Sequence, residues 1–138
     1  MARIVFEMEV AAAPRPIVDA LTTADGIRSW WTDDVELDGD ELRVGFAVAP
    51  KPFVLRVEST SDTEVAWRSV GDFPPHWADT TIVWSITAGE GSSIVHFAHD
   101  GWASDDGPLA GAAFTWGQLL VRLKGFAESG NVAPLFTR

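Results

Sequence analysis

His99 is the side chain whose type and position are best suited to acid–base chemistry. It follows Val95 and Phe97 at alternate positions of a strand-like segment, so it is expected to point to the same buried face. A neutral imidazole there can hydrogen-bond a ligand carbonyl, or act as a general base together with Asp79 or Asp100. The alternative is a structural histidine that satisfies a backbone carbonyl or a helix end. We therefore assign no catalytic residue and keep an enzyme of the cyclase, dehydratase or hydrolase kind as an alternative.

Large aromatic side chains at inward-facing positions predict an apolar pocket for a small hydrophobic molecule. The chain has seven Trp, eight Phe and no Tyr. Phe46, Trp67 and Trp84 have the strand parity of their buried neighbours. Trp116 and Leu120 lie in the apolar stripe of a C-terminal helix. The other interpretation is that these rings simply fill the core. The expected ligand-binding residues are Trp31, Phe46, Phe53, Trp67, Trp84, His99, Trp102, Trp116 and Leu120.

The segment from Phe73 to Trp77, together with Trp102, is expected to form a lid over the mouth of this pocket. Apolar residues in loops often mark contact surfaces. The same residues are equally suited to closing the end of the core.

No metal or other cofactor is expected. His76 and Asp79 have a three-residue spacing that occurs in metal sites, but three His and no Cys leave too few ligands around them. The acidic residues from 33 to 41 are of the type that forms calcium-binding sites. An EF-hand register that starts at Asp34 fails, because its twelfth position is Gly45 instead of glutamate. Their alternation with apolar residues indicates the solvated face of a hairpin.

Length and charge restrict the class of protein. A chain of 138 residues fits one domain, 1–138. Twenty acidic and ten basic side chains give a formal charge of −10, which repels a phosphate backbone or an anionic membrane. Neither nucleic acid nor a membrane is therefore expected as a partner. The N-terminal residues do not form a signal peptide and no apolar stretch is long enough to span a bilayer, so a cytoplasmic location is expected.

The elements that must position these residues can be read from their periodicity. Most of the chain alternates with period two, which predicts strands with one buried face. Two short helices are expected after the first strand, the second over 24–31. From Gly107 to Gly130 the period changes to that of a helix, with Asp106 as the expected N-cap and Gly130 closing the end. Strands are expected at 3–10, 35–37, 42–46, 53–57, 64–68, 80–86 and 93–100.

This order predicts an α+β protein with the helix-grip arrangement, in which a curved antiparallel sheet of about seven strands wraps around the long C-terminal helix. That order resembles the START-like, or SRPBCC, superfamily, which includes the birch-pollen allergen. Three strings resemble more closely the family homologous to the activator of the heat-shock-protein-90 ATPase. They are AAAPRPIVDALTTADGIRSWWT at 11–32, FAHDGW at 97–102, and FTWGQLLVRLKGFAESGNVAP at 114–134.

The resemblance spans essentially the whole chain and implies a cavity between sheet and helix that can hold a hydrophobic molecule. It does not imply a single activity. The eukaryotic activator has an additional N-terminal domain that contacts the chaperone, whereas nothing precedes the first strand here. This departure argues against a chaperone partner. A protein-partner role, through a chaperone or through homodimerisation, stays an alternative.

Overall fold

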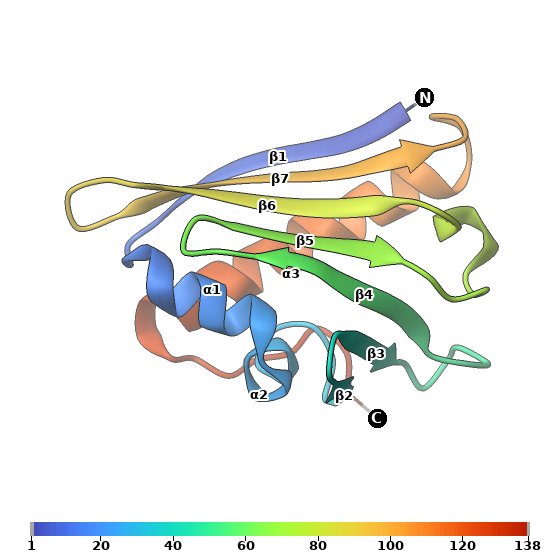
Figure 1. Ribbon diagram of the computed structural model, residues 1–138, viewed down its shortest axis with the longest axis horizontal. Helices are drawn as coiled ribbons and strands as arrows, with labels where there is room; N and C mark the ends of the chain where they lie inside the picture. The colour runs from blue at the N-terminus through green and yellow to red at the C-terminus, as the bar shows by residue number, and fades with distance from the viewer. Residues whose placement is uncertain (1, 138) are drawn as a thin grey trace.

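The computed structural model describes residues 2–137, which form a seven-stranded antiparallel sheet and three α-helices. The strands follow the order β1-β7-β6-β5-β4-β3-β2 across the sheet (Figure 1). Each pair of neighbouring strands except β1–β7 is consecutive in sequence, so short connections between antiparallel strands build most of the sheet. The elements are β1 (Ala2–Val10), α1 (Pro14–Thr22), α2 (Ala24–Arg28), β2 (Asp34–Asp38), β3 (Glu41–Gly45), β4 (Phe53–Thr60), β5 (Glu64–Ser69), the 3₁₀ turn η1 (Pro75–Trp77), β6 (Thr81–Ala88), β7 (Ser93–Trp102) and α3 (Pro108–Ser129).

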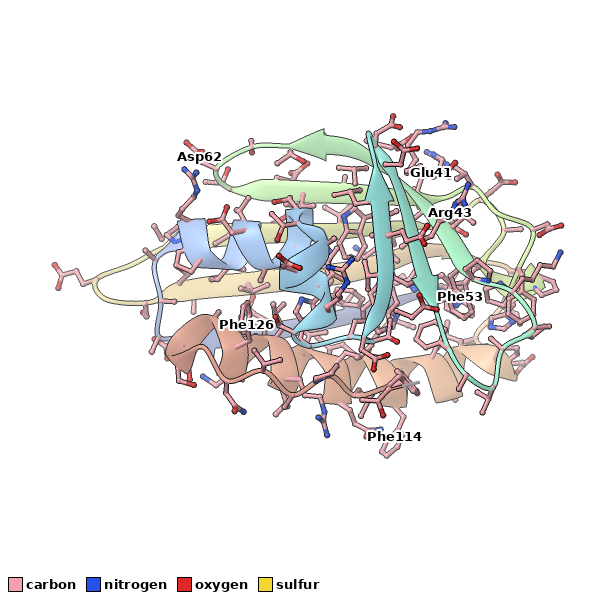
Figure 2. The ribbon with its side chains drawn as sticks, turned by 90° about the horizontal axis from the view of Figure 1, so that it is seen from below. Glu41, Arg43, Phe53, Asp62, Phe114 and Phe126 are labelled. Carbon is pink, nitrogen blue, oxygen red and sulfur yellow. The ribbon has the colours of Figure 1, made fainter. Side chains whose placement is uncertain are left out.

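The sheet curls around its helices, which confirms the helix-grip arrangement expected from the sequence. Figure 2 shows β2 and β3 running at a steep angle to the long strands β6 and β7, with α3 along the side of the molecule away from β4 and β5. Helix α1 contacts both α3 and the middle strands β5 and β6. The core therefore lies between the inner face of the sheet, α1 and α3.

Helix α3 buries the apolar stripe that its sequence predicts. Trp116, Leu119, Leu120 and Leu123 are buried along it. The residue after the helix, Gly130, adopts the left-handed conformation with φ 74°, as expected for a helix-terminating glycine. None of the helices in the described part of the chain is long and apolar enough to cross a bilayer.

Two local predictions about the helices are wrong. Gly107, not Asp106, is the N-cap of α3. Gly107 has a φ of 63°, and no side chain caps this end of the helix. Helix α2 ends at Arg28 and does not continue to residue 31. The chain turns inward after Arg28, so that Trp30 is fully buried and donates a hydrogen bond to the carbonyl oxygen of Ala20, at 2.9 Å.

Candidate functional site

A cavity of about 510 Å³ lies at one end of the core, beside the first turns of α3. Four further segments border it: the stretch after α2, the connection between β3 and β4, the loop that contains η1, and the C-terminal tail. Its volume is within the range of small-molecule sites. The lining residues are Trp31, Phe46, Val48, Ala49, Pro50, Phe53, Phe73, Pro74, His76, Trp77, Pro108, Gly111, Ala112, Thr115, Trp116, Leu119 and Phe136.

Four of the nine residues predicted to contact a ligand line this cavity: Trp31, Phe46, Phe53 and Trp116. Their rings pack edge to face or at a tilt, with Trp31 and Trp116 at a centroid distance of 5.2 Å and Phe46 and Phe53 at 4.9 Å. They come from the segment after α2, from the two sides of the β3–β4 connection, and from α3. These four therefore form a continuous aromatic wall.

The other five do not line the cavity: Trp67, Trp84, His99, Trp102 and Leu120. Trp67 and Trp84 are fully buried at the middle of the sheet, where they pack edge to face at 5.6 Å. Leu120 is buried one turn of α3 beyond Trp116. Inward parity is common to all these positions, but the middle of the sheet is covered directly by α3 and the preceding helices, so rings there fill the core.

His99 is held by a closed hydrogen-bond chain. Its Nδ1 accepts from the indole Nε1 of Trp116 at 3.1 Å, so its proton is assigned to Nε2. Nε2 donates to the hydroxyl of Thr80 at 2.9 Å, and that hydroxyl donates to the carbonyl oxygen of Trp77 at 2.7 Å. Burial, with a smaller contribution from the nearby charge of His76, lowers the pKa of His99 to about 3. The imidazole is therefore neutral at pH 7.

This geometry leaves His99 without a nitrogen for a ligand or for a carboxylate. The enzyme hypothesis required hydrogen-bond reach to Asp79, Asp100 or a bound molecule. Asp100 instead forms an ion pair with Arg3 at 2.8 Å on the outer side of the sheet. The arrangement is that of a structural histidine joining β7, α3 and the start of β6.

The segment that the sequence analysis offers as a lid borders the cavity. Phe73, Pro74, His76 and Trp77 all line the cavity. Trp102 does not line it, but stacks on His76 at a centroid distance of 5.6 Å and so supports this loop from behind. Burial lowers the pKa of His76, which keeps its imidazole neutral at pH 7.

Sequence reasoning missed two parts of the wall. The β3–β4 connection contributes Val48, Ala49 and Pro50, which lie between two predicted strands and are not among the predicted ligand-binding residues. The tail contributes Phe136, whose backbone N–H donates to the carbonyl oxygen of Trp31 at 3.0 Å and whose ring meets Phe46 edge to face at 5.0 Å. Neither segment has a periodic pattern of apolar residues, because each lies outside the helices and strands.

An ion pair joins two of the loops at the mouth. Lys51 lies in the β3–β4 connection, and its Nζ is 3.0 Å from both carboxylate oxygens of Asp72, just before the lid. The hydrogen bond from Lys51 holds the pKa of Asp72 below its ordinary value. In the part of the chain that the structure describes, no group of three or more His, Asp or Glu side chains is arranged to hold a metal ion.

No protein-family model matches the sequence, and no curated protein matches it. Solved structures do match. The solution structure of an Aha1 dimer from Colwellia psychrerythraea superimposes with a TM-score of 0.85 at 28% identity, covering 94% of this chain and 98% of that one. A Staphylococcus saprophyticus crystal structure has a TM-score of 0.76 at 16% identity, with coverages of 99% and 98%. One from Mesorhizobium loti has a TM-score of 0.74 at 15% identity, with coverages of 89% and 94%.

The resemblance inferred from the sequence strings is thus confirmed as a structural match to an Aha1-type protein over nearly the whole chain. The two more distant matches, at 15% and 16% identity, show the fold alone.

Proposed function

We propose that this chain, as a single helix-grip domain, binds one small, largely apolar molecule in the cavity at the open end of its core. The observation that carries the proposal is the aromatic wall of Trp31, Phe46, Phe53 and Trp116 around a volume of about 510 Å³. A ligand that covers the apolar surface of such a cavity removes that surface from water, which favours binding.

The lining also explains why binding is favoured over catalysis. It contains no Asp, Glu, Lys or Arg side chain, and its one imidazole, that of His76, is neutral at pH 7. The wall therefore offers no carboxylate or ammonium group as a general acid or base, and His76 is its one imidazole. The histidine proposed for catalysis, His99, is committed to Thr80 and Trp116.

The test is a fluorescence titration with N-phenyl-1-naphthylamine, an uncharged probe that brightens in apolar surroundings. We expect saturable binding of one probe per chain. Ala112→Phe places a ring in the cavity from α3 and should weaken binding about tenfold or more. Ala110→Phe is the matched control, because Ala110 is exposed on the same helix and does not line the cavity. Absence of saturable binding, or equal binding by Ala112→Phe, would contradict the proposal.

A second proposal, self-association, rests on the outer face of α3. Phe114 and Val121 lie two turns apart there and are 73% and 68% exposed. Figure 2 shows Phe114 on the side of α3 opposite to Phe126, away from the rest of the chain. The matching Colwellia psychrerythraea protein is described as a dimer. We propose that this face forms a homodimer contact.

Sedimentation equilibrium tests the dimer. The wild-type chain should show the dimer mass, and Phe114→Ser should shift it to the monomer. Val48→Ser is the control, since Val48 is another exposed apolar side chain, 93% accessible, outside α3. A wild-type monomer at every concentration would overturn this second proposal without affecting ligand binding.

A further inference from the structure

The cavity wall has few polar groups. Their charge and hydrogen bonding define the kind of ligand that the cavity can accept. Apart from the indoles, only His76 and Thr115 bring polar side-chain atoms to the lining. The hydroxyl of Thr115 donates to the carbonyl oxygen of Gly111 at 3.1 Å, within the helix. Because no lining side chain carries a charge to compensate one on the ligand, a charged molecule would lose its hydration without replacement. The formal charge of −10 further opposes anions.

The tryptophan N–H groups fall into three classes. Those of Trp30 and Trp116 donate to Ala20 and His99 inside the core. Those of Trp67, Trp84 and Trp102 are sealed from solvent without a partner. The two remaining indoles belong to Trp31 and Trp77, which both line the cavity. Each is almost completely buried, at 2% and 5% exposure, yet neither N–H donates to a described residue and neither nitrogen is among those sealed from solvent.

The rings that carry these two donors are neighbours. The Trp31 and Trp77 rings have a centroid distance of 6.5 Å and an interplanar angle of 34°. Both rings also contact Trp116, which lines the cavity beside them, at 5.2 Å and 6.1 Å. An indole N–H is only a donor, so it needs an acceptor atom on the ligand. A carbonyl oxygen has two lone pairs and can accept from one or both.

We propose that the cavity selects an uncharged, predominantly apolar molecule that carries a carbonyl or ether oxygen, and that Trp31 and Trp77 donate hydrogen bonds to that oxygen. This inference rests on the proposed ligand-binding function and specifies its chemistry. The surrounding rings of Phe46, Phe53 and Trp116 supply the apolar contacts. The two indoles supply the polar recognition, since an unpaired donor in an apolar wall favours a ligand that satisfies it.

Fluorene and 9-fluorenone are suitable probes, because they have the same tricyclic shape and differ by a methylene and a carbonyl. Fluorenone is the more polar, so transfer from water alone favours fluorene. A preference for fluorenone must therefore come from a donor on the protein. We expect equilibrium dialysis to show fluorenone bound about three- to tenfold more tightly. The fluorene-9-carboxylate anion should not bind measurably.

Variants assign the preference to its donors. Trp31→Phe and Trp77→Phe each keep a ring and remove the N–H, and should reduce the preference for fluorenone while fluorene affinity changes less. Trp67→Phe is the matched control, because its N–H is also without a partner but is sealed away from the cavity. It should leave the preference unchanged. Thermal unfolding checks each variant, and Trp77→Phe alone decides the matter if Trp31→Phe does not fold.

The outcomes separate this inference from the proposed function. If neither fluorene nor fluorenone binds, both are wrong. If both bind but fluorene binds as tightly as fluorenone, or the anion binds well, the cavity is a binding site without the selectivity proposed here. If the preference survives in both Trp31→Phe and Trp77→Phe, the donor lies elsewhere and the assignment to these indoles is overturned.

Discussion

The two ends of the aromatic interior are built from the same residue types and differ in how completely they are covered. At the centre, Trp84 packs against Trp67, Phe97 and Trp116 at centroid distances of 4.8 to 5.9 Å and is fully buried. At the open end, Phe53 meets Trp77 at 4.9 Å and is only half-buried. Rings from β5, β7, α3 and the buried segment after α2 surround Trp84, whereas the connection after β3, the loop that contains η1 and the tail border the open end.

Whether a ring fills the core or lines the cavity depends on how fully other side chains enclose it. Trp67 and Trp84 are enclosed by neighbouring rings and fill the core, since these side chains interdigitate. Phe53 is enclosed less completely and lies beside the cavity. The polar groups follow the same division: the N–H of Trp116 is used by His99, whereas those of Trp31 and Trp77 are not used within the described residues.

Truncation of a ring at each end should show the largest contrast. Trp84→Ala leaves a void in a site that is closed on all sides and should lower the free energy of unfolding by about 3–5 kcal/mol. Phe53→Ala should cost roughly half as much or less, because part of the ring is already in water. Urea denaturation followed by circular dichroism measures both. Equal costs would show that the two ends are equally well packed.

The pH dependence of stability should report the burial of His99. The pKa of His99 is about 3 in the folded chain and about 6.5 in the unfolded chain, so the unfolded chain binds the extra proton between these values. The stabilisation is complete above pH 6.5 and is lost as the pH falls toward 3. Between pH 7.5 and pH 5 the loss should be about 2 kcal/mol.

His99→Gln removes the titrating group but keeps an acceptor for Trp116 and a donor for Thr80. The difference between wild type and variant therefore isolates this contribution, since every other titrating group is common to both. Urea denaturation at pH 7.5 and pH 5 should show a smaller loss in the variant. Parallel losses in the two proteins would mean that His99 is accessible to protons in the folded state.

The smallest effect is expected at the mouth of the open end. Asp72→Asn removes the ion pair with Lys51 between two exposed side chains, and such pairs contribute little. The melting temperature should stay unchanged within error, and raising the salt concentration should not alter that result. A clear decrease would show that the mouth is held in place by this pair.

The sequence predicted the regular part of the molecule well. Alternation identified the strands and the inner face of β7, and the 3.6-residue period identified the stripe of α3 that contains Trp116. These patterns are local, so they can be read without knowing the partner. Parity could not separate Trp84, which fills the core, from Phe46, which lines the cavity, because both point inward.

The missing parts depend on contacts between distant segments. The hydrogen-bond partners of His99 are Thr80, just before β6, and Trp116, on α3. Neither residue is near His99 in sequence. Phe136 reaches the cavity because the tail pairs with the backbone at Trp31. No sequence motif predicts this pairing. A short helix after residue 24 was predicted, but its end at Arg28 was not, since tertiary burial of Trp30 overrides the helical pattern.

The most direct test of the account is a ¹⁵N–¹H spectrum of the seven indole N–H groups, recorded with and without fluorenone. The resonances of Trp31 and Trp77 should shift most and exchange more slowly with water in the complex. Those of Trp30 and Trp84 should stay in place. Shifts confined to the indoles that do not line the cavity, or no shift at saturating fluorenone, would contradict the claim that the open end is where this protein binds its ligand.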